Sequence, residues 1–166
     1  MTCGITSEWN TLLGVEAGAA ATLTGLIFVA VSLNLSRILS IAGLSGRAAE
    51  AMLQLLEVFF VSTLALVPGQ PTNVLAMEIL AVGILFWMVQ TVALIRHLRK
   101  RPGHYPWSWF LYRAALSQLA TVPFCIAGVT LLLGVCAGVY WLVPGALFSF
   151  AAAMMSAWVL LVEILR

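Results

Sequence analysis

The chain has 166 residues, of which 63% are hydrophobic and only 8% are charged. Water-soluble domains carry about 25% charged residues, because their surfaces face water. The composition therefore excludes an ordinary water-soluble domain and predicts one all-α integral membrane domain over residues 1–166.

Five stretches of the chain are long and apolar enough to span a bilayer, which takes about 20 mostly apolar residues. In chain order they cover residues 12–39, 48–67, 73–98, 109–135 and 144–166. No Lys or Arg precedes the first stretch, unlike in a cleaved signal peptide, so we expect it to be retained as a helix. A four-span alternative stays open, in which the segment from Trp109 onward forms one span and a re-entrant piece.

Prolines lie at the end of one of these stretches and within another. The second stretch stops at the Pro-Gly-Gln-Pro sequence of residues 68–71, a strong helix breaker. Pro123 lies near the middle of the fourth stretch. Proline removes a backbone hydrogen bond, so we expect a kink there.

The basic residues lie beside alternate connections between the stretches. Those next to the first and third connections, and at the last residue, are Arg37, Arg47, Arg96, Arg99, Lys100, Arg101, Arg113 and Arg166. The second and fourth connections carry no charge. Cytoplasmic connections are enriched in Lys and Arg, so the pattern predicts a cell-membrane protein with its N-terminus outside and its C-terminus in the cytoplasm. Trp9, Tyr140 and Trp141 would then lie at the outer interface, where aromatic residues gather.

Groups that support catalysis or metal binding are scarce. The chain has no Asp, both histidines (His97 and His104) fall in the basic third connection, and no HExxH, GxSxG or phosphate-loop motif is present. We therefore expect no enzyme activity, no metal site and no cofactor. Cys3, Cys125 and Cys136 have no CxxC spacing and are expected to pack as small apolar residues. A disulfide between Cys3 and Cys136 on the outer side is the alternative.

The second stretch carries a line of polar residues. Glu50, Gln54 and Glu57 follow one another at spacings of four and three, which places them on one helix face. Glu57 falls near the middle of the span, and ionisable residues at such depth usually mark ion or proton paths. Glu16 and Glu78 are candidates for the same path in the outer half of the bilayer. The alternative is structural: an ion pair for Glu50 and a packed carboxyl for Glu57.

Two further groups of residues indicate contacts with lipids or other helices. Gly14, Gly18 and Gly25 give the first stretch a face of small residues, which favours close helix packing. The basic run at the third connection is a candidate site for a lipid head group. It comprises Arg96, His97, Arg99, Lys100 and Arg101. Because the positive-inside pattern explains these charges together with all the others, we expect no nucleic-acid partner.

These patterns favour a homo-oligomeric channel or transporter for cations or protons, with a pore lined by the polar face of the second stretch. One bundle of five helices leaves little room for a wide pore, so assembly around a symmetry axis is expected. Two alternatives stay open. One is a non-transporting regulatory or assembly subunit that binds another membrane protein, and the other is a lipid-binding protein or membrane enzyme.

Overall fold

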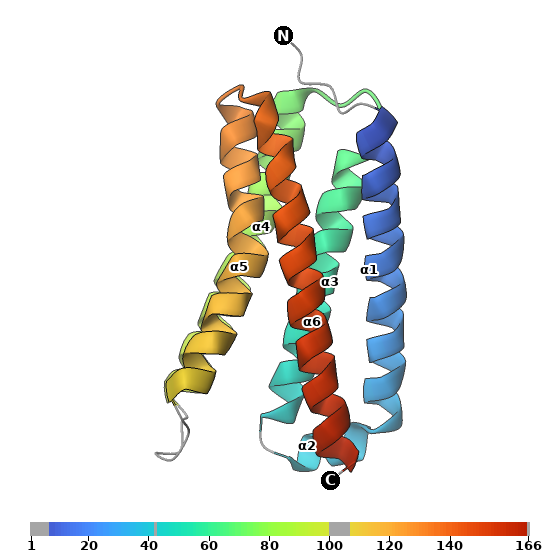
Figure 1. Cartoon of the computed structure of the whole chain (residues 1–166), viewed down its shortest axis with the longest axis vertical. Helices are drawn as coiled ribbons and strands as arrows, with labels where there is room; N and C mark the ends of the chain where they lie inside the picture. The colour runs from blue at the N-terminus through green and yellow to red at the C-terminus, as the bar shows by residue number, and fades with distance from the viewer. Residues whose placement is uncertain (1–6, 42, 100–106, 166) are drawn as a thin grey trace.

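The computed structural model describes residues 7–41, 43–99 and 107–165, which form helices and short turns with no strand among them. In chain order the helices are α1 (Ser7–Leu33), α2 (Leu35–Ser40), α3 (Leu44–Ala65), α4 (Thr72–Arg99), α5 (Trp107–Leu132), the 3₁₀ helix η1 (Cys136–Trp141) and α6 (Leu142–Leu165). Within these described residues, α1, α3, α4, α5 and α6 are long and apolar enough to cross a membrane (Figure 1). The prediction of an all-α chain with five such helices is confirmed.

The first predicted helix is divided into two. α1 ends at Leu33, and Asn34 adopts φ −115° and ψ 20° before α2 begins. The side-chain amide of Asn34 donates to the carbonyl of Ala30 over 2.9 Å. Asparagine side chains that bond to nearby backbone groups compete with the helical pattern, which accounts for the break. After α2, Gly43 adopts a left-handed conformation with φ 89°, which favours glycine, and α3 begins.

α3 lies at the centre of the bundle, where it contacts α1, α4 and α6. It is the most deeply buried of the five long helices, with half of its most apolar window enclosed. α4 packs mainly on α5, which also contacts α6. The start of α1 and η1 lie at one end of the bundle, called here the η1 end, and α2 lies at the other, the α2 end (Figure 1).

Small residues fill the contacts between helices, and large apolar residues point outward. Completely buried alanines occur on four of the long helices: Ala20, Ala51, Ala76, Ala120 and Ala127. The outward-facing apolar side chains include Phe28, Leu33, Leu133, Met154 and Trp158. In hydrocarbon, helices associate through close backbone approach and gain little from burying large apolar side chains. The fold therefore has the distribution expected of a chain surrounded by lipid.

The η1 end holds the main apolar core of the bundle. Its buried members include Val58, Val61, Ile79, Phe124 and Leu131. Trp9 of α1 packs edge-to-face on Tyr140 of η1, with ring centroids 5.1 Å apart. The two aromatic residues therefore share one end of the bundle, and their place at the outer interface stays a prediction.

α4 and α5 form a closely packed pair. A Cβ atom added at Gly128 would lie 2.7 Å from the Cβ and 2.8 Å from the backbone nitrogen of Leu80, so only glycine fits there. Further along the pair, Trp87 Nε1 donates to Gln118 Oε1 over 2.8 Å, and Gln118 Nε2 reaches Thr91 Oγ1 at 3.5 Å. Close backbone approach and interhelical hydrogen bonds are the two forces that join helices in a membrane.

α5 diverges from α6 toward the α2 end. α5 continues through Pro123, where the backbone lacks one hydrogen bond and helices tend to bend. Figure 1 shows the half of α5 nearer the α2 end leaning away from α6. The divergence leaves the bundle less tightly closed on this side.

Candidate functional site

The three polar residues predicted on one helix face point into the bundle. Glu57 is completely buried, Gln54 is 1% exposed and Glu50 is half-buried. Their spacing places them on one face of α3. Because α3 is the central helix, this face lies toward α4, α5 and α6. The structure therefore encloses these side chains within a single chain.

Glu57 is connected to two other helices through hydrogen bonds. Gln90 of α4 donates from Nε2 to Glu57 Oε2 over 3.4 Å, and Ser117 of α5 donates to Gln90 Oε1 over 2.8 Å. Gln90 and Ser117 are themselves buried. The other carboxyl oxygen of Glu57, Oε1, has no hydrogen-bond partner among the described residues. A buried polar atom without a partner costs about 1–3 kcal/mol of stability.

Glu50 has a different environment, although it lies on the same helix face. Arg113 of α5 donates to Glu50 Oε2 from Nε over 2.8 Å and forms a second contact through Nη2. Both side chains are partly exposed, at 15% for Glu50 and 23% for Arg113. The structural ion pair considered for Glu50 is confirmed, with Arg113 as its partner.

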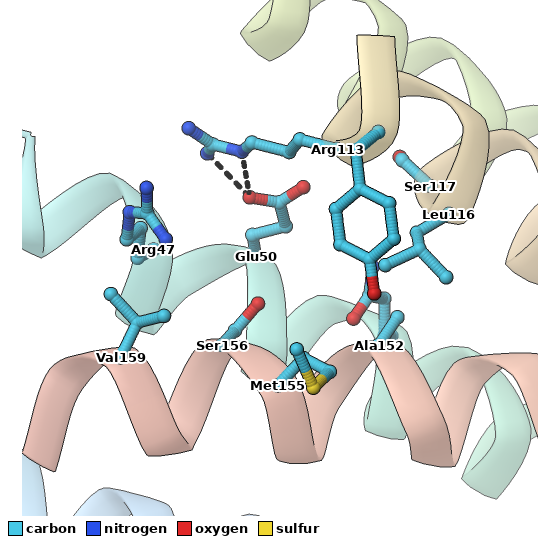
Figure 2. A pocket seen from close by; sticks show the side chains of 11 residues that line it. Arg47, Glu50, Arg113, Leu116, Ser117, Ala152, Met155, Ser156 and Val159 are labelled. Carbon is cyan, nitrogen blue, oxygen red and sulfur yellow. Dashed lines mark hydrogen bonds and ion pairs between the residues drawn. The ribbon is translucent and has the colours of Figure 1, made fainter. Parts of the chain in front are cut away.

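Two cavities flank this ion pair in the half of the bundle nearer the α2 end. The first lies between α3, α4 and α5, has a volume of about 170 Å³ and is lined by Gly46, Leu53, Gln90 and Ala93 together with the ion pair. The second lies between α3, α5 and α6 (Figure 2). It has a volume of about 60 Å³ and also borders both charged residues. The first cavity reaches the Glu57 cluster through Gln90, and the second reaches it through Ser117.

Glu16 and Glu78 lie apart from this cluster. Glu16 of α1 is buried, and its Oε2 accepts a 3.5 Å hydrogen bond from Ser62, on the side of α3 that packs on α1. Glu78 accepts a hydrogen bond from Gln70 Nε2 over 2.5 Å, near the turn that precedes α4. Neither carboxyl is joined to Glu57 by a hydrogen bond among the described residues, so their part in one common path stays a prediction.

The small-residue face of α1 points away from its own bundle. Gly14, Gly18 and Gly25 are exposed, and a Cβ added to any of them would meet nothing within 4 Å. Close packing between this face and another helix of the described chain is therefore not observed. The expected packing against a further helix stays a prediction.

The basic cluster and the cysteines are described only in part. Arg96 and Arg99 are exposed at the end of α4, whereas the side chain of His97 and all of Lys100 and Arg101 lie outside the described residues. Cys136 is disulfide-bonded, Cys125 is free, and Cys3 also lies outside the described residues. In the part of the chain that is described, no group of three or more His, Cys, Asp or Glu residues could hold a metal ion.

Gln90 is the central residue that the sequence patterns did not reveal. It carries the only amide between Glu78 and Arg96, in an otherwise mostly apolar run. A single amide at a depth similar to that of Glu57 is the feature of the sequence that could have identified Gln90. Helical spacing along one chain segment cannot show this, because the hydrogen bond joins α3 to α4.

No protein-family model matches the chain, and neither the curated proteins nor the solved structures gave a significant match. The function is therefore inferred from the buried polar cluster and the cavities beside it.

Proposed function

We propose that the protein is a membrane transporter that carries protons, with Glu57 as the carboxyl group that binds the transported proton. The observation that supports this most is the complete burial of Glu57 with one carboxyl oxygen unpartnered. Among the described residues, no Lys or Arg forms an ion pair with it. Carboxyl groups inside a membrane are costly and usually belong to ion or proton pathways.

The chemistry around Glu57 favours a proton over a metal cation. A metal cation needs several oxygen ligands. Gln90 instead presents an amide N–H donor to Glu57, and Ser117 presents its oxygen-bound hydrogen to Gln90. A buried carboxyl group that contacts one neutral donor, and no further oxygen ligand among the described hydrogen bonds, suits the binding and release of a single proton.

The path that we propose is open on one side only. The cavity between α3, α4 and α5 leads from the α2 end to Gln90, next to Glu57. Toward the η1 end, the apolar core around Val61, Ile79 and Phe124 lies beyond Glu57. Such an arrangement supports a carrier in one of its access states, since a channel needs a polar route on both sides.

The polar path lies within one chain. Transport along it needs no symmetry axis, so homo-oligomeric assembly is a separate prediction. The closely packed α4–α5 pair is the element we expect to move as a unit against α3 and α6, because its internal contacts are tighter than its contacts around the cavities. Rigid-body movement of one helix group against another is the common means of alternating access.

Two features support placing the α2 end in the cytoplasm. Arg37, Arg47 and Arg113 lie near this end, as expected for the positive-inside pattern. Cys136, at the opposite end, is disulfide-bonded, and disulfides persist mainly in oxidising compartments outside the cytoplasm. Glu57 would then be reached from the cytoplasmic side.

Proton flux into liposomes tests the proposal. Purified protein is reconstituted into vesicles that contain a pH-sensitive dye, and a proton gradient is imposed. We expect wild type to dissipate the gradient and Glu57→Gln to fall to the rate of protein-free vesicles, since glutamine cannot bind the proton. Glu78→Gln is the matched control. The path proposed here, through Gln90 to Glu57, does not include Glu78, so this variant should keep wild-type flux. Equal flux for wild type and Glu57→Gln at equal reconstitution would contradict the assignment.

A further inference from the structure

Two side chains one turn apart on α3 each bury an oxygen atom that has no hydrogen-bond partner among the described residues. These atoms are Gln54 Oε1 and Glu57 Oε1, and their side chains are 1% exposed and completely buried, respectively. Side chains three residues apart on a helix are neighbours, with Cβ atoms about 5–6 Å apart. Both atoms are acceptors when Glu57 is ionised, so they cannot bond to each other. One small molecule with two donor groups satisfies both.

A small cavity leads to Gln54 from the surface of the bundle. The polar residues that line the cavity between α3, α5 and α6, besides the Glu50–Arg113 pair, include Gln54, Tyr112, Ser117 and Ser156 (Figure 2). Tyr112 is 50% exposed, whereas Gln54 and Ser117 are buried. The cavity therefore runs inward from the surface to Gln54, one helical turn before Glu57.

The size and lining of this cavity suit water. Its volume of about 60 Å³ is far below the range of ligand sites, about 300–1,000 Å³. One water molecule needs only about 10–15 Å³ of such space together with polar partners, so the cavity has room for more than one. A water molecule donates two hydrogen bonds of about 2.8 Å and bridges acceptors up to roughly 5.5 Å apart. This matches two neighbouring acceptors on one helix face.

We propose that water fills this cavity and that one water molecule donates to both Gln54 Oε1 and Glu57 Oε1. Gln54 is then a positioning residue, because it holds water beside the carboxyl. As a hydrated site the cavity is independent of transport, but as a route for protons it rests on the function proposed for Glu57.

The bridging water gives the proton a way to one particular oxygen of Glu57. Glu57 Oε2 accepts the amide N–H of Gln90, and an amide does not release its proton at neutral pH. Oε1 is therefore the oxygen that receives the proton. The bridging water gives one proton to Oε1 and takes one from the next water in the cavity, so the net change is one proton moved from the cavity to the carboxyl. The cavity is a second entrance on the same side as the cavity that leads to Gln90.

Silver-ion labelling tests whether the cavity is hydrated. Silver ions are small, travel through water and bind soft thiolate sulfur. Ala152→Cys places a thiol in the wall of the cavity, at a buried position of α6. Val58→Cys is the matched control, because Val58 is completely buried in the apolar core directly after Glu57. Both variants carry Cys125→Ala, which removes the free cysteine of the described chain. After brief exposure in chloride-free buffer, mass spectrometry should show silver on Ala152→Cys and none on Val58→Cys.

Proton flux into liposomes tests the role of Gln54. Gln54→Leu removes the acceptor that holds the water, and we expect flux to fall by roughly fivefold, the effect of losing one neutral hydrogen bond. Gln118→Leu removes an amide of the same size away from the cavity and should keep wild-type flux.

Three results would overturn the proposal. Absence of silver on Ala152→Cys would show that the cavity is dry, and equal labelling of Val58→Cys would show that silver reaches any buried thiol. Wild-type flux in Gln54→Leu would show that Gln54 holds no water that the proton uses. Silver on Ala152→Cys alone, with wild-type flux in Glu57→Gln, would instead contradict the proposed function and support the hydrated site, so the two failures are distinguishable.

Discussion

At the scale of single residues, two carboxyl groups on one helix face have opposite environments. Glu50 is partly exposed and paired with Arg113, so its charge is balanced on site. Glu57, two turns further along α3, is completely buried and contacts only a neutral amide through the one hydrogen bond described for it. Burial in an apolar environment disfavours the ionised form of a carboxyl group, so the proton that we propose Glu57 carries would neutralise it there.

Gln90 holds this arrangement together, and its replacement gives a prediction. Gln90→Leu leaves Glu57 Oε2 and the Ser117 hydroxyl without their partners. We expect the free energy of unfolding to fall by about 1–3 kcal/mol, measured by thermal melting in detergent, and proton flux to fall as well. Gln118→Leu also removes an amide that bonds between α4 and α5, but away from Glu57. Its flux should match wild type, and an equal loss of flux in both variants would show that Gln90 has no special role.

At the scale of elements, the glycines distinguish the faces that pack within the chain from those that do not. A Cβ added at Gly128 would lie 2.8 Å from backbone atoms of Leu80, whereas one added at Gly18 would have nothing within 4 Å. We predict that Gly128→Ala forces α4 and α5 apart and lowers the free energy of unfolding by about 1–3 kcal/mol. Gly18→Ala should be neutral or stabilising by up to roughly 1 kcal/mol, as expected for alanine in a helix.

Circular dichroism melting in detergent measures both glycine variants. Equal melting temperatures for Gly128→Ala and wild type would show that the α4–α5 contact is looser than described. Destabilisation of Gly18→Ala would show instead that the outward face of α1 is covered in the purified protein.

Most of the helices were predictable from the sequence, because the length and apolarity of a segment are enough to identify a membrane-spanning helix. The break at Asn34 was not predicted, because it depends on one side chain bonding to the carbonyl of Ala30 within a continuously apolar stretch. The polar face of α3 was predictable from helical spacing. Helical spacing does not determine which helices pack together. The sequence therefore did not predict that this face is buried inside one chain, or that Gln90 and Arg113 are its partners.

At the scale of the whole molecule, the bundle is asymmetric from one end to the other. The η1 end is closed by an apolar core and by the contact between Trp9 and Tyr140. The half nearer the α2 end contains the two cavities and the Glu50–Arg113 pair. In the function that we propose, this asymmetry gives Glu57 access from one side of the membrane, as expected for one access state of a carrier.

Infrared difference spectroscopy after a pH step tests most directly whether Glu57 exchanges a proton. The method detects the carbonyl stretch of a protonated carboxyl group, which disappears when the proton leaves. We predict that wild type and Glu78→Gln in proteoliposomes both show the same change of the carboxyl band with the pH step. In Glu57→Gln this change should be smaller, because the contribution of Glu57 is lost while the buried carboxyl of Glu16 remains. The same band in Glu57→Gln as in wild type would contradict the assignment of Glu57 as the group that binds the transported proton.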